Sequence, residues 1–169
     1  AICTTPTDPW IVFAAGAMSA GKRYTINSLI KNGRFPLLSF VYVDPGFISR
    51  HLPDFRLYTQ VCPKSAGEMT RKEAGYIAEI LTYAACEKGQ NVVYCGVFKS
   101  PDWFSTWFSE LKTSYPKVRI AMLHIDAPRE VVFKRAKEKA LETGFEVPED
   151  ELETALKNAS NSAELLKPK

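Results

Sequence analysis

Short apolar segments alternate with amphipathic ones along most of the chain. Four apolar segments predict strands at residues 10–15, 38–43, 91–95 and 118–125. Helical spacing of apolar residues predicts helices over residues 24–31, from Ser65 or Thr70 to about 87, over 101–115, over 128–143, and from Pro148 onward. Strands that alternate with helices are typical of an α/β fold, in which a parallel sheet is covered by helices on both faces.

The composition indicates one folded unit. The chain has 169 residues, of which 46% are hydrophobic, and this is enough for a substantial core. Without an internal repeat or linker, residues 1–169 are expected to form a single domain. The 22 basic and 19 acidic residues give a net charge of +3 and are scattered along the chain, so no nucleic-acid-binding surface is indicated.

Cysteine spacing and hydropathy bear on where the protein works. The four cysteines, Cys3, Cys62, Cys86 and Cys95, form no C-x-x-C pair, and a chain of this size needs no disulfides to fold. No apolar run approaches the roughly 18 residues of a membrane span, and no signal peptide is visible. We therefore expect the protein to work in an intracellular, reducing compartment, for which the cytoplasm is the preferred choice. We expect no contact with a membrane. Because the chain starts at Ala1 rather than Met, we interpret it as a fragment of a longer protein.

The segment after the first predicted strand matches a phosphate-binding loop except at its last position. The Walker A pattern G-x-x-x-x-G-K-[ST] is complete from Gly16 through Lys22, but Arg23 replaces its Ser or Thr. Such loops hold phosphates with backbone N–H groups, a helix N-terminus and the lysine. The missing hydroxyl is a magnesium ligand in these loops, and Thr25 lies about 200° away around the helix. Arg23 could place a cation where the metal would lie, or form a salt bridge across the site.

The pattern therefore predicts phosphate or nucleotide binding without a magnesium site. The predicted nucleotide-binding residues of the loop are Gly16, Ala17, Met18, Ser19, Ala20, Gly21, Lys22 and Arg23. A glycine-rich turn with a chance lysine is the alternative. Ligands of open α/β sheets bind outside the carboxyl ends of the strands, so we expect residues 16–23, 44–47 and 95–99 to converge there.

These segments resemble the zeta-toxin type of P-loop kinase. Residues 15–22 match its loop, and residues 43–53 are similar to its V-D-x-D-x-[FI]-[KR]-x-x-x-P stretch. Residues 73–79 resemble the helix after its second strand, and residues 127–130 with 143–148 resemble its lid. The likeness covers about residues 8–148 and implies a P-loop NTPase or kinase-like fold. It also implies transfer of phosphate from ATP or GTP to a small acceptor such as a UDP-N-acetylhexosamine.

The resemblance also predicts the topology of the sheet. Related P-loop kinases usually close the sheet with a fifth strand after the lid. We expect the strand order 2-3-1-4, with the fifth strand absent or outside this fragment. The edge beside the fourth strand should then be open or covered by a partner.

Four positions depart from the functional groups of that family. The resemblance places the acceptor-activating Asp at Gly46, an acid of the third strand at Cys95 and a lid arginine at Phe145, while Arg23 is the fourth departure. Lys99 fills the family's basic position four residues after Cys95. Phosphoryl transfer depends mainly on positioning and electrostatic stabilisation. Losing these groups together predicts a catalytically impaired domain, a pseudokinase.

Other candidate side chains each have a structural alternative. Asp44 could replace the missing base or cap the turn that Asp-Pro-Gly favours. Cys95 could be a reactive thiol or a small inert residue at a strand end. Arg135 could act as a lid arginine that binds the nucleotide, or be an exposed charge. His51 and His124 have no metal-ligand partner at useful spacing and are expected to pack or to lie at the surface.

Two functions remain in view at this stage. The first is an interaction or scaffold module that works with a protein partner, including one in the rest of a longer parent chain, and that keeps weak binding of ATP, GTP or phosphate. The second is an active ATP- or GTP-dependent small-molecule kinase in which Lys22 holds the phosphates and Asp44 serves the acceptor. We expect the first, because the departures concentrate in the crevice.

The helix predicted at residues 101–115 carries an aromatic stripe. Its members, which fall within about 140° of the helix circumference, are Trp103, Phe104, Trp107, Phe108 and Leu111. Packing on the sheet is one explanation, since crossover helices bury one face. Trp and Phe are also enriched in interface cores. We therefore expect at least one ring to stay exposed and to join a contact with a partner.

Overall fold

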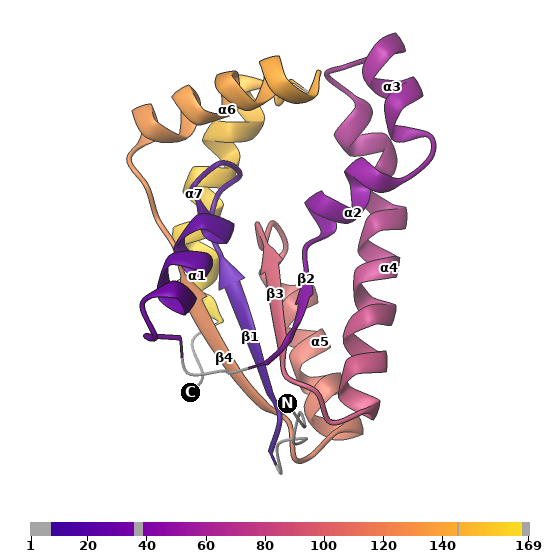
Figure 1. Cartoon of the computed structure of the whole chain (residues 1–169), viewed down its shortest axis with the longest axis vertical. Helices are drawn as coiled ribbons and strands as arrows, with labels where there is room; N and C mark the ends of the chain where they lie inside the picture. Colours follow the sequence, from indigo (N-terminus) through magenta and orange to yellow (C-terminus); the bar gives the residue numbers. More distant parts are fainter. Residues whose placement is uncertain (1–7, 36–38, 145, 167–169) are drawn as a thin grey trace.

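A computed structural model describes residues 8–35, 39–144 and 146–166. The strands are β1 (Trp10–Ala15), β2 (Val41–Val43), β3 (Val92–Gly96) and β4 (Arg119–His124). The helices are α1 (Lys22–Lys31), α2 (Pro45–His51), α3 (Phe55–Val61), α4 (Ala66–Glu87), α5 (Pro101–Ser114), α6 (Arg129–Thr143) and α7 (Glu149–Leu165). Strands and helices alternate along most of the chain, as the sequence predicts (Figure 1).

The strands form a parallel sheet in the order β2-β3-β1-β4, which confirms the predicted order and the α/β fold class. β1 is central, with Ile11 opposite Val92 of β3 and Trp10 opposite Arg119 of β4. Within the described residues β4 pairs only with β1, and every residue of β4 is at least partly exposed. The outer edge of β4 is therefore open in this part of the chain.

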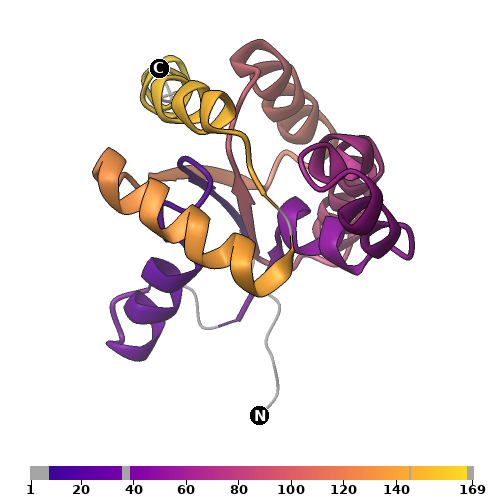
Figure 2. The ribbon, with the colours of Figure 1, turned by 90° about the horizontal axis from the view of Figure 1, so that it is seen from above.

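Helices cover both faces of the sheet, because the side chains of β1 alternate between them. Ile11 and Phe13 pack toward α4 and α5, whereas Val12 and Ala14 pack toward Ile26 of α1. Seen from above, α6 crosses over the carboxyl ends of the strands beside α7 (Figure 2). Among the described residues, no helix combines the length and the apolar character needed to cross a membrane.

The structure differs from the sequence prediction between residues 39 and 61. β2 is shorter than the strand predicted at residues 38–43, because its ladder to β3 runs only from Val41 to Val43, and residues 36–38 lie outside the described residues. The sequence also missed α2 and α3. At α2 the predicted turn is instead the start of a helix: Asp44 accepts a hydrogen bond from the Phe47 N–H, and Pro45 takes the first helical position.

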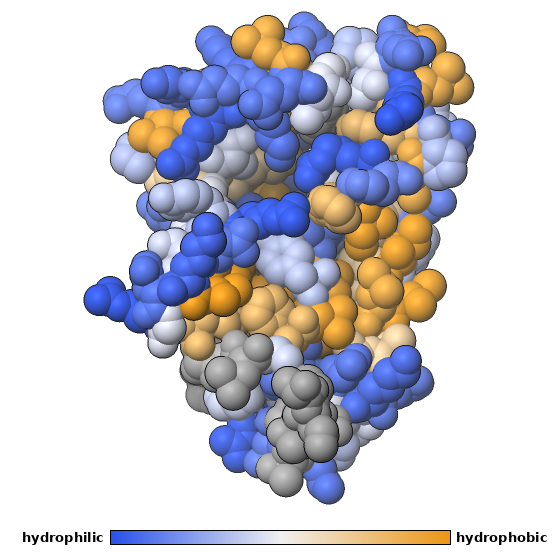
Figure 3. Space-filling model, in the orientation of Figure 1, coloured by the Kyte–Doolittle hydropathy of each residue, from blue (hydrophilic) through white to orange (hydrophobic). Residues whose placement is uncertain are grey.

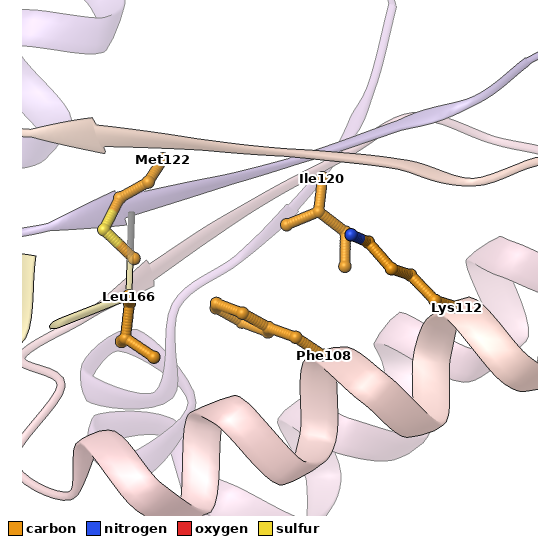
Figure 4. Close-up of a pocket in the computed structure, with 5 residues that line it drawn as sticks. All are labelled: Phe108, Lys112, Ile120, Met122 and Leu166. Carbon is orange, nitrogen blue, oxygen red and sulfur yellow. The ribbon is translucent and has the colours of Figure 1, made fainter. Parts of the chain in front are cut away.

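Two hollows flank β4. A cavity of about 60 Å³ lies between β4 and α5, where Ile120 and Met122 face Phe108 and the end of α7 (Figure 4). A groove of about 440 Å³ lies on the other face of the sheet, lined by Trp10, Val12, Leu29, Arg34, Phe35, Ala121, Met122 and Leu123. Both hollows lie beside the sheet and not at the loop after β1.

The aromatic stripe of α5 forms much of the core on one face of the sheet. Phe104, Trp107 and Leu111 are buried, and the Trp107 ring lies edge-on to the Phe13 ring with centroids 5.5 Å apart. Trp103 remains 41% exposed. The expectation that one ring stays exposed is confirmed, and its contact with a partner stays a prediction.

Substituting Phe13 tests whether this aromatic cluster holds the sheet to α5. The Phe13 side chain is fully buried, and its ring centroid lies 4.4 to 6.5 Å from those of Tyr94, Phe98, Phe104, Trp107 and Phe108. Phe13→Ala should lower the free energy of unfolding by about 3–5 kcal/mol. Urea unfolding followed by circular dichroism measures this loss.

Tyr24→Ala is the matched control, since Tyr24 is 77% exposed on α1. It should change the free energy of unfolding by no more than about 0.5 kcal/mol. Equal losses in the two variants would contradict the central role assigned to Phe13.

Candidate functional site

The loop between β1 and α1 collects the predicted phosphate-binding residues at the end of the central strand. Only glycine fits at position 16, because a Cβ at this position would lie 2.3 Å from the Ile125 carbonyl oxygen. Gly21 has a φ of 100°, in the left-handed region that glycine adopts without strain. Ser19 also has a positive φ, of 61°. The backbone geometry thus accounts for both glycines of the sequence pattern.

Lys22 lies folded against this loop. Its Nζ donates hydrogen bonds to the carbonyl oxygens of Gly16 at 2.8 Å and Ala17 at 2.9 Å. Burial lowers the pKa of Lys22 to about 8, and the nearby Cys95 and Asp44 partly offset this effect. The ammonium group is therefore still mainly protonated at neutral pH, and it lies within electrostatic range of the ends of β2 and β3.

α6 covers the loop from above. Ala17 and Ala20 are buried against α6 and α7, with Met18 partly buried beside them. Arg135 of α6 donates a hydrogen bond from Nη1 to the Ala20 carbonyl oxygen at 3.1 Å, and the same nitrogen lies 3.0 Å from the position that a Cβ of Gly21 would take. Arg135 is exposed, as one of the two interpretations expected, and it also lies at the loop, so its role in nucleotide binding stays a prediction.

Arg23 points from the start of α1 toward β2 and α2. Its guanidinium carbon lies 5.7 Å from the Tyr42 ring centroid and 5.2 Å from that of Phe47, within cation–π range of both. The Phe47 ring in turn stacks on His51 with centroids 4.1 Å apart. In the described part of the chain Arg23 makes no ion pair, so the salt bridge considered from the sequence is not observed.

Asp44 and Gly46 lie together at the start of α2. The Asp44 carboxylate caps this helix through the Phe47 N–H at 3.1 Å, which confirms the capping interpretation. A Cβ at Gly46 would lie 3.2 Å from Asp44 Oδ1 and 3.8 Å from Arg50 Nη1. An acid at position 46 would therefore meet the carboxylate that already stands there, beside a guanidinium group.

Cys95 lies at the end of β3 as a buried thiol. Its Sγ is 3.0 Å from the Tyr42 hydroxyl oxygen. Burial raises the pKa of the Cys95 thiol to about 11, although the hydrogen bond with Tyr42 and the charges of Lys22 and Arg23 act in the opposite direction. A thiol with this pKa is protonated at neutral pH, which favours the inert alternative over the reactive one.

The remaining residues that the sequence analysis singled out lie farther from the loop or outside the residues that the structure describes. Lys99 forms an ion pair with Glu151 of α7 at 3.5 Å. His51 and His124 are exposed, which agrees with the surface position expected for them. Phe145, the replaced lid position, lies outside the described residues.

The sequence analysis did not single out two basic residues of this region. Arg50 of α2 lies beside Gly46, and Lys139 lies one helical turn after Arg135 on α6. Burial and the charge of Arg50 lower the pKa of Lys139, whereas the charge of Asp44 acts in the opposite direction. The helical spacing from Arg135 was a usable signal for Lys139, whereas nothing in the sequence pairs α2 with α6.

Positive charges predominate around Lys22. Arg135 and Lys139 add positive charge near the loop, and Asp44 is the carboxylate that acts on Lys22 in the described residues. Mg²⁺ is usually held by one or two carboxylates together with phosphate oxygens and water. Across the described part of the chain, no three His, Cys, Asp or Glu side chains form a group that could hold a metal.

Solved structures share this fold at low sequence identity. A chain of the Pnkp1/Rnl/Hen1 RNA repair complex matches with a TM-score of 0.62 and 19% identity, covering 97% of this chain and 48% of its own length. A chain of the PezAT toxin-antitoxin system of Streptococcus pneumoniae matches with a TM-score of 0.65 and 18% identity, covering 82% of this chain and 55% of its own. A putative kinase from Chloroflexus aurantiacus matches with a TM-score of 0.66 and 12% identity, covering 90% of this chain and 80% of its own length. The likeness shows a P-loop kinase-like fold, and this chain spans about half the length of the first two.

Sequence comparison identifies the family. No curated protein sequence matches the chain with significance. The zeta-toxin family model, in contrast, matches residues 1–169. The match extends beyond the roughly 8–148 segment in which the motifs alone show a likeness. The chain therefore belongs to the zeta-toxin family.

Proposed function

We propose that this chain is a catalytically impaired member of its family, which binds an anionic ligand without Mg²⁺ and serves as an interaction or scaffold module. The observation that carries the proposal is the position of Arg23. At the place of the magnesium-ligating hydroxyl, the loop has a guanidinium group that lies over Tyr42 and Phe47. An arginine therefore occupies the chain position at which the family pattern has a metal ligand, and its guanidinium group lies beside β2 and α2.

A guanidinium group can supply part of what a metal supplies. It stays protonated over the whole physiological pH range and binds phosphate oxygens through a planar set of N–H donors. The rings of Tyr42 and Phe47 lie within cation–π range of the Arg23 guanidinium, which favours a position of this charge beside β2 and α2. Such a group favours phosphate binding but gives neither the two positive charges nor the coordination geometry of Mg²⁺.

The acceptor side supports the same proposal. A kinase of this type needs a base to take the proton of the acceptor hydroxyl. Gly46 offers no side chain, Cys95 is protonated at neutral pH, and Asp44 is engaged as the cap of α2. The alternative is an active small-molecule kinase in which Lys22 holds ATP or GTP and Asp44 leaves its cap to act as the base. The proximity of Asp44 to Lys22 favours that alternative.

The proposal includes a protein partner and a reducing intracellular compartment. The exposed Trp103 at the start of α5 is the surface that we assign to the partner. The similar chain of the RNA repair complex comes from a multiprotein assembly. Cys62, Cys86 and Cys95 are free thiols, which agrees with a reducing environment.

ATP binding should be weak and almost independent of Mg²⁺. Because Arg23 supplies a cation and no metal ligand, the dissociation constant should change by less than about twofold when a chelator replaces Mg²⁺. Arg23→Thr restores the hydroxyl oxygen, and Mg²⁺ should then tighten ATP binding by about tenfold. Calorimetric titrations with and without Mg²⁺ measure both effects.

Arg56→Thr is the control for the lost charge, since Arg56 is exposed on α3. This variant should remain indifferent to Mg²⁺. Tight ATP binding by the unaltered chain that strictly needs Mg²⁺, together with phosphate transfer to an acceptor, would refute the proposal and support the active kinase.

Anion binding at the loop should weaken as the pH rises through about 8. Burial has lowered the pKa of Lys22 to about 8, so its ammonium group is present below that pH and is lost above it. Sulfate keeps its charge over this range, so a change in its binding reports on the protein. Its dissociation constant should rise by up to about tenfold per pH unit above 8. Thermal shift titrations with sulfate at constant ionic strength follow this change.

Lys22→Arg keeps a positive charge at every pH tested, so the loss above pH 8 should disappear in this variant. Lys22→Met should bind sulfate weakly at all pH values. If the unaltered chain binds sulfate equally well at pH 7 and pH 10, Lys22 is not the anion-binding group that we propose.

A further inference from the structure

The outer edge of β4 presents backbone groups that no strand of the described residues pairs with. The Arg119 N–H donates to the Pro9 carbonyl oxygen at 2.9 Å, and the Ile125 N–H donates to that of Ala15 at 2.8 Å. Both residues therefore direct their backbone groups toward β1, and alternate residues of a strand direct them to opposite sides. The N–H and C=O groups that point away from β1 are those of Ile120, Met122 and His124.

β4 lacks the features that usually protect an edge strand. Natural edge strands are very short, or they carry charged residues, proline or a bulge that opposes pairing with another chain. β2, at the other edge of the sheet, has only 3 residues. In β4, by contrast, residues 120–123 are all apolar, and the ladder to β1 runs without a bulge from Arg119 to His124. β4 can therefore accept a further strand at its free edge.

Both faces of the sheet are hollowed beside this edge. On the α5 face, the cavity of about 60 Å³ between β4 and Phe108 has room for a small side chain only (Figure 4). On the α1 face, the groove of about 440 Å³ is lined by Leu123 and Phe35, and the space-filling view shows apolar side chains gathered beside α1 (Figure 3). The side chains of an added strand alternate between the two faces. They would be small on the α5 face and large on the α1 face.

The lining of each hollow includes one cation and no acid. Lys112 of α5 lines the cavity, and Figure 4 shows its side chain directed toward Ile120. Arg34, which follows α1, lines the groove. In the described part of the chain neither cation forms an ion pair. A second copy of the chain would bring the same two cations to this edge, whereas an acidic segment would neutralise them.

We propose that the free edge of β4 binds an extended segment of another protein, which adds a strand to the sheet. The segment has large apolar side chains toward the groove, small ones toward the cavity, and carboxylates that reach Lys112 and Arg34. Backbone hydrogen bonds would supply the affinity, and the two hollows would supply the specificity. This inference rests on the protein partner of the proposed function and gives that partner a contact surface besides Trp103.

Hydrogen exchange at single amides, followed by ¹⁵N NMR, tests the added strand. The probe is the capped peptide Asp-Leu-Ala-Phe-Ala-Leu-Asp, which alternates large and small apolar residues between two carboxylates. At saturation it should slow exchange at Ile120, Met122 and His124 by at least about tenfold, because their N–H groups gain acceptors. Exchange at Ala121 and Leu123, whose N–H groups face β1, should change by less than about twofold. Uniform protection, or none, would overturn the proposal.

Two variants separate edge pairing from other binding. Met122→Pro removes an N–H that points away from β1, which an edge strand tolerates, and its ring blocks a further strand. It should weaken binding of the labelled peptide, measured by fluorescence anisotropy, by at least about tenfold. Arg34→Glu with Lys112→Glu leaves the backbone unchanged, so it tests the site even if the proline variant fails to fold. This variant should bind the peptide about tenfold more weakly and should prefer a peptide with Lys in place of Asp.

The control for charge combines Arg56→Glu on α3 with Lys134→Glu on α6. Both residues are exposed, and the net charge changes by the same amount as in the Arg34 and Lys112 variant. The control should bind the acidic peptide within about twofold of the unaltered chain. An equal loss in the two variants would mean general electrostatics and would refute the site.

Further outcomes separate this inference from the proposed function. Sedimentation of the unaltered chain should show a monomer, and a dimer that Met122→Pro dissociates would mean that a second copy takes the edge, which overturns the proposal. Failure of the peptide to protect alternate residues of β4 would leave ATP binding without Mg²⁺ standing. Tight ATP binding that needs Mg²⁺, together with the alternating protection, would refute the impaired kinase and support the strand site.

Discussion

The position of β1 between two parallel partners is the constraint on which the site depends. Ladders to β3 and β4 fix β1 from both sides, and the Ile125 N–H extends the second ladder to the Ala15 carbonyl oxygen at 2.8 Å. The Ile125 carbonyl then lies so close that only glycine fits at position 16. The chain must turn there, and this turn sets the direction of α1 and the place of Lys22. The geometry of this loop is thus a consequence of sheet pairing more than of the loop by itself.

Electrostatics give the crevice its character. Lys22 and Arg135 lie at the loop, and Arg23 lies beside it, whereas five other basic side chains of the described residues form ion pairs with acids: Arg71, Lys99, Arg119, Arg129 and Lys137. Gathering cations costs stability because like charges repel, and the charge of Asp44 offsets part of this cost at Lys22. An arrangement of this kind is stabilised when an anion binds. The pKa of Lys22 is lowered because burial makes its charged form less favourable.

The sequence predicted what depends on local patterns and missed what depends on contacts between distant segments. Apolar periodicity located all four strands of the described residues and the long helices, and the glycine pattern located the loop. α2 was missed because Asp44-Pro45-Gly46 favours a turn and a helix start equally, and the helix has only 7 residues. The two rings within cation–π range of Arg23 come from β2 and α2. No local pattern joins such residues, since only the folded sheet brings them together.

The residues at the positions that depart from the family pattern are compatible with the fold. Gly46 and Arg23 are exposed, so their side chains contribute little to the core, and Cys95 is a small neutral group in a buried place. The aromatic cluster around Phe13 lies on the other face of the sheet from Cys95 and is independent of these changes. Exchanging an acid for a thiol or a glycine also removes the cost of desolvating a carboxylate. Each replacement is therefore compatible with the fold.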